Sequence, residues 1–123
     1  MGKLVDQLSQ SYDFEVAGRL DIDNNRDGTG ITADQVRDVD VAIDFSTADA
    51  VVANLPRLAE HGVNLVVGTT GWVAQERAMR KVVTDTGIGV VAAANFSLGV
   101  NLFLALTARA ARLFEPHEEF GAW

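Results

Sequence analysis

The sequence predicts an α/β fold in which helices flank a parallel sheet. Strand-like segments alternate with segments of helical periodicity along the chain, which is the order typical of a parallel sheet. Two of the strand-like segments, 64–67 and 88–93, are almost free of polar residues and therefore fit strands that are covered on both faces. The length of 123 residues is that of about one small domain.

The first half of the chain is predicted to contain a helix, two strands and a long loop. Apolar residues recur at helical spacing in 4–8, which predicts a short amphipathic helix at the start of the chain. Apolar and polar residues alternate in 14–20, which predicts a strand. Residues 21–37 are polar and contain Asn-Asn and Asp-Gly pairs typical of a loop, and 39–45 (VDVAIDF) predicts a second strand.

A helix is expected to follow the second strand. Ser46 stands three residues before Asp49, which resembles a capping box, and an apolar stripe then runs to His61-Gly62, a normal helix end. Pro56 lies inside this segment, so we expect it to kink the helix or to shift its start.

The second half of the chain continues the alternation. A strand is predicted at 63–67, a helix at 72–84, a strand at 88–93 and a long apolar helix at 98–114. The last residues, 115–123, are expected to begin a further element. Helices and strands thus alternate along the chain, except that a long loop stands between the first two predicted strands.

Composition excludes several classes of function. Lysine and arginine number 10 against 17 acidic residues, so the net charge is 10 − 17 = −7, which argues against nucleic acid or an anionic membrane as the main partner. Cysteine is absent, which excludes disulfides, thiolate metal sites and a cysteine nucleophile. No stretch approaches the roughly 18 apolar residues of a membrane span, and the start lacks a signal peptide, so a cytoplasmic location is expected.

Ligands of open parallel sheets bind beyond the carboxyl ends of the strands, so the residues that follow each predicted strand form the candidate site. These residues are Asp21, Asp44-Phe45-Ser46, Gly68-Thr69-Thr70-Gly71 and Ala94-Asn95-Phe96-Ser97. We expect the four segments to converge on one edge of the sheet. The third is called the GTTG turn below.

Each segment suits a dinucleotide for a chemical reason. An acid at the end of a strand, here Asp21, accepts hydrogen bonds from ribose hydroxyls. The glycines of the GTTG turn allow a flat ligand to approach the backbone, while its threonines supply hydroxyls and amides. Asn95 suits a carboxamide, Phe96 offers an aromatic wall, and the amides at the start of the 98–114 helix suit an anion.

Plainer interpretations stay open for every one of these residues. Asp21 alone is a common turn residue, the GTTG turn is a common strand-to-helix connection with Thr70 as a cap, and Asn95 is a common helix cap. Asp44-Phe45-Ser46 could simply end a strand and cap a helix. The remaining candidates are expected to be structural: His61 near a helix end, His117 in a solvated loop and Trp72 packed on the next helix, with a cover for the ligand cleft as the alternative for Trp72.

Three segments resemble the dihydrodipicolinate reductase family in content, order and spacing. They are Asp44-Phe45-Ser46, the GTTG turn and residues 93–101 (AANFSLGVN), and the resemblance extends from Met1-Gly2 to about Phe120. It implies a Rossmann-type parallel sheet with flanking helices that is incomplete at both ends. Residues 1–96 would be part of the dinucleotide-binding domain, and 97–123 the start of the domain for substrate and tetramer contacts.

The resemblance also implies a reaction and its cofactor. The family uses NADH or NADPH to reduce a cyclic imine, 4-hydroxy-tetrahydrodipicolinate, in lysine and diaminopimelate synthesis. The resemblance also implies that the full-length form is a homotetramer. No metal is implied, and Thr70 would also contact the dicarboxylate substrate. The residues that would bind the cofactor are Gly2, Asp21, Phe45, Gly68, Thr69, Thr70, Ala93, Ala94, Asn95 and Phe96.

The chain departs from the family pattern at both ends. Only Met1-Gly2 matches the end of the family's phosphate loop, Gly-x-x-Gly-Arg-Met-Gly, so Gly2 would be its last glycine. The family's His-His-x-x-Lys and Ser-Gly-Thr runs, which supply the proton donor and substrate contacts, would lie beyond Trp123. No catalytic residue is therefore expected in the chain, and the 123-residue chain is expected to show no reductase activity by itself.

Cofactor choice and two rival functions complete these expectations. Asp21 repels a 2′-phosphate and is followed by Ile22 rather than arginine, so NADH should be accepted at least as well as NADPH, although Arg26 is near enough in sequence to reach that phosphate. The rivals are another Rossmann-type reductase of aspartate-derived metabolites and a dinucleotide-binding module without catalysis.

Overall fold

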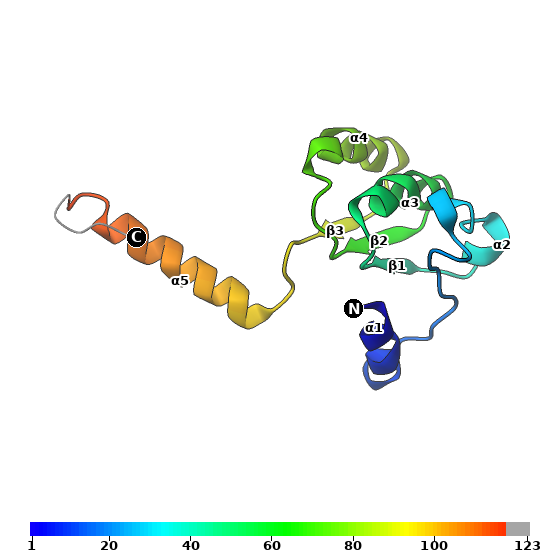
Figure 1. Cartoon of the computed structure of the whole chain (residues 1–123), viewed down its shortest axis with the longest axis horizontal. Helices are drawn as coiled ribbons and strands as arrows, with labels where there is room; N and C mark the ends of the chain where they lie inside the picture. The colour runs from blue at the N-terminus through cyan, green and yellow to red at the C-terminus, as the bar shows by residue number, and fades with distance from the viewer. Residues whose placement is uncertain (118–123) are drawn as a thin grey trace.

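The computed structural model describes residues 1–117 and contains one open sheet of three parallel strands (Figure 1). The strands are β1 (Val41–Asp44), β2 (Asn64–Val67) and β3 (Val90–Ala92), arranged in the order β1-β2-β3. Each neighbouring pair is parallel. The predicted α/β class with a parallel sheet is thus confirmed, and each of the three strands lies within a segment that the sequence predicted to be a strand.

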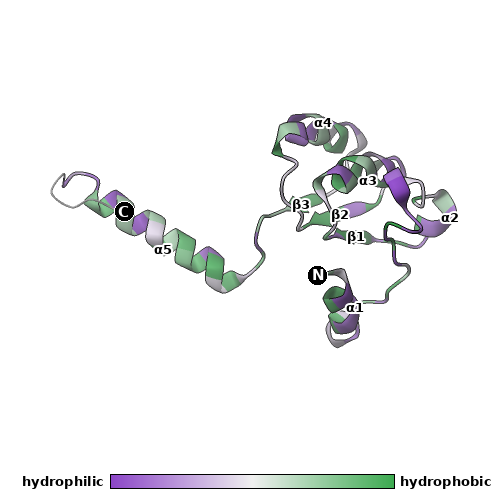
Figure 2. Ribbon diagram, viewed as in Figure 1, coloured by the Kyte–Doolittle hydropathy of each residue, from purple (hydrophilic) through white to green (hydrophobic). Residues whose placement is uncertain are grey.

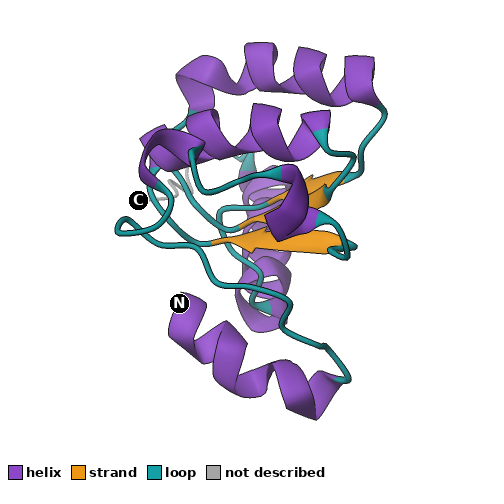
Figure 3. Cartoon of the chain, turned by 90° about the vertical axis from the view of Figure 1, so that its right-hand side faces the viewer, coloured by secondary structure: helices purple, strands orange, loops and turns teal. Residues whose placement is uncertain are grey.

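Two helices connect the strands and cover one face of the sheet (Figures 1 and 3). Helix α3 (Ala48–Glu60) joins β1 to β2, and α4 (Glu76–Thr86) joins β2 to β3. Their apolar sides meet alternate residues of β2, because successive side chains of a strand point to opposite faces. The core formed in this way contains Val51, Leu55 and Leu58 of α3, Leu65 and Val67 of β2, and Met79 of α4.

The opposite face of the sheet is open among the described residues. Ile43, Val66 and Val91 form one row across the three strands, and Ile43 and Val91 are 43% and 58% exposed. The prediction that 64–67 and 88–93 are covered on both faces is therefore wrong for this part of the chain. The physical reason is that β1, β2 and β3 follow one another in a single direction, so crossovers of the same hand place both helices on the same face.

Helix α1 (Gly2–Ser9) confirms the predicted opening helix, and it packs on the segment that follows it. Arg19 donates to Asp6 at 2.5 Å (Nη2 to Oδ1), and this hydrogen bond lowers the pKa of the Asp6 carboxyl. The backbone N–H of Phe14 donates to the carbonyl of Ser9 at 3.0 Å. In Figures 1 and 3, α1 lies on the side of the open sheet face without joining the sheet.

The predicted strand at 14–20 is not formed. This segment runs as an irregular chain, and Phe14 and Leu20 are exposed. A strand exists only through hydrogen bonds to a neighbour, and among residues 1–117 β1 pairs with β2 alone, so its other edge has no strand beside it. Although apolar and polar residues alternate in 14–20, this segment therefore has no neighbouring strand with which to form hydrogen bonds.

The predicted loop at 21–37 contains a short helix and is docked on α3. Helix α2 (Ala33–Val36) starts at Thr32, whose hydroxyl accepts a hydrogen bond from the N–H of Gln35 at 3.4 Å. Gly28 has φ +76° and lies so close to α3 that a Cβ there would meet Cδ of Arg57 at 2.7 Å. The four-residue helix was not predicted, because a single turn is too short to show helical periodicity.

The start of α3 differs from the prediction. Its N-cap is Thr47, whose hydroxyl accepts from the N–H of Ala50 at 3.3 Å, and not Ser46. The hydroxyl of Ser46 instead donates to the carboxylate of Asp44 at 2.5 Å, so it is not available as a cap. Pro56 lies inside α3, which nevertheless continues to Glu60 without a break.

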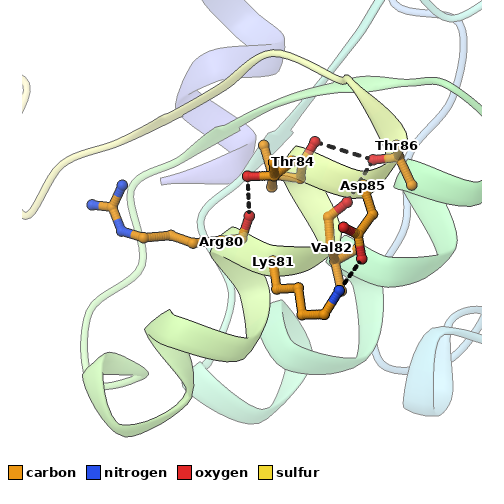
Figure 4. Close-up of polar contacts among 7 residues, drawn as sticks. Arg80, Lys81, Val82, Thr84, Asp85 and Thr86 are labelled. Atoms are coloured by element: carbon orange, nitrogen blue, oxygen red, sulfur yellow. Dashed lines mark hydrogen bonds and ion pairs between the residues drawn. The ribbon is translucent and has the colours of Figure 1, made fainter.

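The segment predicted as a helix at 72–84 begins with a 3₁₀ turn (Val73–Gln75), and α4 follows it. Helix α4 ends at Gly87, which adopts φ +75° and donates its N–H to the carbonyl of Val83 at 2.9 Å. Its exposed side chains are paired locally: Lys81 meets Asp85 at 2.6 Å, and the hydroxyl of Thr84 donates to the carbonyl of Arg80 at 2.9 Å (Figure 4). These contacts stay within the helix itself.

Helix α5 (Leu98–Phe114) has the predicted bounds and extends away from the sheet (Figure 1). None of its residues is buried, and Figure 2 shows apolar residues along its length. The large exposed ones are Leu98, Val100, Leu102, Phe103, Leu104, Leu106, Leu113 and Phe114. Of the further element predicted at 115–123, residues 118–123 lie outside the described part of the chain.

No helix within residues 1–117 is long and apolar enough to cross a membrane. The same residues contain no group of three or more histidine, aspartate or glutamate side chains that could hold a metal ion.

Candidate functional site at the carboxyl ends of the strands

The three strands end at the same edge of the sheet, and this edge gathers three of the four predicted segments. The N–H of Gly68 donates to the carbonyl of Asp44 at 2.9 Å, which joins the end of β1 to the start of the GTTG turn. The N–H of Ala93 donates to the carbonyl of Val67 at 3.1 Å, which joins the end of β2 to the segment after β3. These two bonds extend the parallel pairing by one residue on each side and hold the segments side by side.

An aromatic pair stands over this edge. The ring of Phe45 lies so close to Gly68 that a Cβ at position 68 would be 1.9 Å from Cε1 of Phe45. Phe96 approaches Phe45 edge to face, with ring centroids 6.4 Å apart and an angle of 71° between the rings. The sequence predicted that Gly68 admits a ligand, whereas the space beside Gly68 is filled by Phe45, so the two rings are the surface that a flat ligand would meet.

The Asp44 carboxylate is the polar centre of the edge. It is almost fully buried, and its Oδ1 accepts hydrogen bonds from the N–H of Ser46 at 2.9 Å and from the hydroxyls of Ser46 and Thr69 at 2.5 and 3.3 Å. Its Oδ2 accepts from Nδ2 of Asn54, on α3, at 3.2 Å. Asp44 thus does more than end a strand, because it joins the ends of β1 and β2 to the second turn of α3.

The GTTG turn is held from several sides. The hydroxyl of Thr69 points inward, since it donates to Asp44 and accepts from the N–H of Ser46 at 2.8 Å. The indole Nε1 of Trp72 donates to the carbonyl of Thr69 at 2.8 Å. Gly71 adopts φ +94°, which favours glycine at that position. Thr70 is exposed and does not cap the following helix, so of the two threonine hydroxyls only that of Thr70 is free within the described chain.

Asn95 forms a turn rather than a helix cap. Its Oδ1 accepts from the N–H of Ser97 at 2.7 Å, while the hydroxyl of Ser97 caps α5 by accepting from the N–H of Val100 at 3.4 Å. Asn101 reaches back and donates to the carbonyl of Asn95 at 3.0 Å. Among residues 1–117 the Asn95 amide nitrogen donates no hydrogen bond, so it remains available to a ligand.

The two remaining predicted residues lie apart from this group. Oδ1 of Asp21 accepts from the N–H groups of Asp23 and Asn24 at 2.9 and 3.3 Å, which is the turn that the plainer interpretation predicted, and the residue is exposed. Gly2 is the first residue of α1, and a Cβ there would meet nothing within 4 Å. Ala93 and Ala94, by contrast, lie at the edge directly after β3.

Sequence reasoning missed two polar residues of this region. They are Asn54 on α3 and Asn25 in the loop before α2. Asn54 joins Asn25 to the Asp44 carboxylate, since its Nδ2 donates to Asp44 and its Oδ1 accepts from Nδ2 of Asn25 at 2.9 Å. The signal that could have identified Asn54 is its position: it is a polar residue that interrupts the apolar stripe of α3, directly before the fully buried Leu55.

Three parallel strands in one open sheet, joined by flanking helices, are the architecture of a Rossmann-type α/β domain. Residues 1–96 match the family model described as "Dihydrodipicolinate reductase, N-terminus". The chain belongs to the dihydrodipicolinate reductase family.

Curated relatives agree with this assignment. The chain is 31% identical to the 4-hydroxy-tetrahydrodipicolinate reductase of Christiangramia forsetii over 98% of its own length and 48% of the relative. It is 34% identical to the enzyme of that name from Methanoculleus marisnigri over 91% of its length and 46% of the relative. With the same-named protein of Methanopyrus kandleri it shares 41% identity over 63% of its length and 28% of the relative.

The chain therefore spans about half the length of the first two relatives. No solved structure matches it significantly.

Proposed function

We propose that this chain contributes the nicotinamide-cofactor part of a reductase that uses NADH or NADPH to reduce 4-hydroxy-tetrahydrodipicolinate to tetrahydrodipicolinate. The observation that supports this most directly is the convergence of Phe45, the GTTG turn and Asn95-Phe96 at one edge of the sheet. Family membership supplies the reaction, since relatives covering this chain are named 4-hydroxy-tetrahydrodipicolinate reductase.

The groups at the edge fit a dinucleotide. The free amide nitrogen of Asn95 and the backbone of Ala93 and Ala94 would bind the nicotinamide carboxamide. The rings of Phe45 and Phe96 would form the apolar wall beside it. When bound, the cofactor supplies the hydride, and the residues of this chain bind and orient it.

Asp21, Gly2 and Thr70 have separate roles in the proposal. The carboxylate of the exposed Asp21 would accept from ribose hydroxyls, and the backbone at Gly2 would approach the phosphates. The Thr70 hydroxyl, which is exposed and without a partner within residues 1–117, would contact the dicarboxylate substrate.

We further propose the division of the chain at residues 96 and 97. Residues 1–96 would belong to the cofactor domain, and 97–123 would begin the domain that binds substrate and builds a homotetramer. The family match ends at residue 96, and α5 leaves the sheet two residues later, which supports this boundary.

Calorimetric titration of the purified chain with NADH and NADPH tests the cofactor proposal. We expect NADH to bind at least as tightly as NADPH, because the Asp21 carboxylate repels a 2′-phosphate. Asp21→Asn keeps an oxygen for the local turn and removes the charge, so it should shift the preference toward NADPH. Asp23→Asn is the matched control, since it removes the same charge two residues away, and it should leave the preference unchanged. Binding of neither cofactor would refute the proposal.

A further inference from the structure

We infer that Asn54 and Asn25 are positioning residues for the adenosine side of the cofactor, because they join the Asp21 loop to the buried Asp44 carboxylate by a continuous chain of hydrogen bonds. The inference rests on the proposed function, since it assigns these residues to the binding of the same dinucleotide. Neither asparagine belongs to the segments that mark the candidate site in the sequence.

This hydrogen-bond chain consists of three successive hydrogen bonds that link β1, α3 and the loop before α2. Nδ2 of Asn54 donates to Oδ2 of Asp44 at 3.2 Å, and Nδ2 of Asn25 donates to Oδ1 of Asn54 at 2.9 Å. The N–H of Gly30 then donates to Oδ1 of Asn25 at 3.0 Å. Both asparagines are half-buried, and the carboxylate at the end of the chain is almost fully buried.

The donor-to-acceptor direction of the hydrogen-bond chain is fixed at both of its ends, Gly30 and Asp44. A carboxylate oxygen can only accept, and the backbone N–H of Gly30 can only donate. Each of the two amides between them is therefore restricted to one orientation, since turning either by 180° would place two donors or two acceptors face to face. The hydrogen bonds therefore fix the orientation of both side-chain amides.

One end of the chain reaches Asp21. The N–H of Asn25 donates to the carbonyl of Asp21 at 2.8 Å, and Oδ1 of Asn24 accepts from the N–H of Asp21 at 2.8 Å. The loop itself has little freedom, because Gly28 is packed against Arg57 and Ile31 is buried in the core. The position of Asp21 is thus coupled to the orientation of the Asn25 side chain.

The other end reaches the GTTG turn. Oδ1 of Asp44 accepts from the hydroxyl of Thr69 and from the N–H and hydroxyl of Ser46. The chain therefore connects the residue proposed to bind the ribose with the turn proposed to bind the other half of the cofactor. Removal of Asn54 breaks this connection in the middle while leaving Asp21 and Thr69 themselves unchanged.

Hydrogen exchange of backbone amides tests the hydrogen-bond chain in the absence of any cofactor. We expect Asn54→Ala to accelerate exchange of the Gly30 amide, because Asn25 loses the partner that orients it. Asn64→Ala is the matched control: Asn64 also joins two segments, by donating to the carbonyl of Asp40 at 3.2 Å and accepting from Gly89 at 2.7 Å, but at the opposite end of the strands. If the Gly30 amide exchanges at the same rate in the unmodified protein, in Asn54→Ala and in Asn64→Ala, the inference is overturned.

A double-mutant cycle on NADH affinity tests the positioning role. Loss of one hydrogen bond corresponds to roughly a fivefold change, so we expect Asn54→Ala to weaken NADH binding on the order of fivefold. In an Asp21→Ala background the same change should have little further effect, since the group that it positions is gone. A general loss of structure would instead multiply the two losses, and that result would overturn the inference.

Asn25→Asp provides a second variant should Asn54→Ala fail to fold. It retains the oxygen that accepts from Gly30 and replaces the donor to Asn54 by an acceptor, so it breaks the chain at a loop residue. It should weaken NADH binding and depend on Asp21 in the same way. Failure of the unmodified chain to bind NADH would refute the proposed function, whereas normal binding with independent losses would refute this inference alone.

Discussion

At the scale of single residues, the contact between Phe45 and Gly68 leaves no room for a side chain at position 68. A methyl group there would lie 1.9 Å from the Phe45 ring, so the ring must move and its contact with Phe96 is lost. We expect Gly68→Ala to lower the free energy of unfolding by about 1–3 kcal/mol, as overpacking does. Urea unfolding measures this loss, and titration should show weaker NADH binding.

Gly18→Ala is the control for that change. A Cβ at Gly18 would meet nothing within 4 Å, so we expect its effect on stability to stay within about 0.5 kcal/mol. Gly18 lies outside the sheet edge, in the irregular segment before Asp21. If the two substitutions cost the same, the close approach of Phe45 to Gly68 is not what constrains position 68.

Individual residues were predictable where a motif marked the end of a strand. Phe45 and Gly68 follow strands directly, Asn95 comes three residues after the last strand, and the placement of those segments at one edge follows from parallel pairing. Asn54 and Asn25 were not predictable, because their importance comes from contact across 29 residues of sequence. An asparagine in a helix or a loop is common, and nothing local distinguishes one that joins two segments.

At the scale of elements, α3 supplies more buried core residues than α4, which contributes Met79 alone. Leu55 is 1% exposed and contacts the core of β2, so we expect Leu55→Ala to lower the free energy of unfolding by about 2–5 kcal/mol. The matched control is Leu104→Ala on α5, where the leucine is 57% exposed and the change should stay within about 0.5 kcal/mol. Chemical unfolding of both variants checks the expectation, and similar losses would contradict it.

Elements were predicted well where the local signals suffice to define them. The bounds of α5 agree with the prediction because a long apolar run defines a helix without reference to the rest of the chain, although its cap is Ser97 and not Asn95. The segment 14–20 has an equally clear alternation, but a strand depends on a neighbour that its own sequence cannot supply. The cap of α3 moved from Ser46 to Thr47 for a related reason, since Asp44 binds the serine hydroxyl.

At the scale of the whole molecule, the described residues expose apolar side chains on the open sheet face and along helix α5, among other places. Large contiguous apolar patches on a protein surface favour association. We expect the purified chain to self-associate with rising concentration, which sedimentation velocity measures. Leu102 and Leu106 stand four residues apart on one side of α5 and are both exposed, so replacing both with glutamine should reduce association.

Thr107→Gln, a polar-to-polar change on the same helix, is the control and should leave association unchanged. A chain that stays monomeric at all concentrations, or a double variant that associates like the unmodified chain, would show that α5 is not the cause. The apolar composition of α5 was evident from the sequence. The open sheet face was not, because the same hydrophobic strands fit a sheet covered on one face or on two.

Trp72 provides an optical probe of the GTTG turn. Its indole nitrogen donates to the Thr69 carbonyl at 2.8 Å, and its half-buried ring packs against the core. The sequence contains two tryptophans, so replacing Trp123 with phenylalanine leaves Trp72 as the sole tryptophan, which can be excited selectively at the red edge of its absorption. Nicotinamide in its reduced form absorbs in the range where tryptophan emits, and binding near the turn would therefore quench this residue by energy transfer. The protein thus contains its own fluorophore at the place where its ligand is proposed to bind, and no label is needed to follow occupancy in real time.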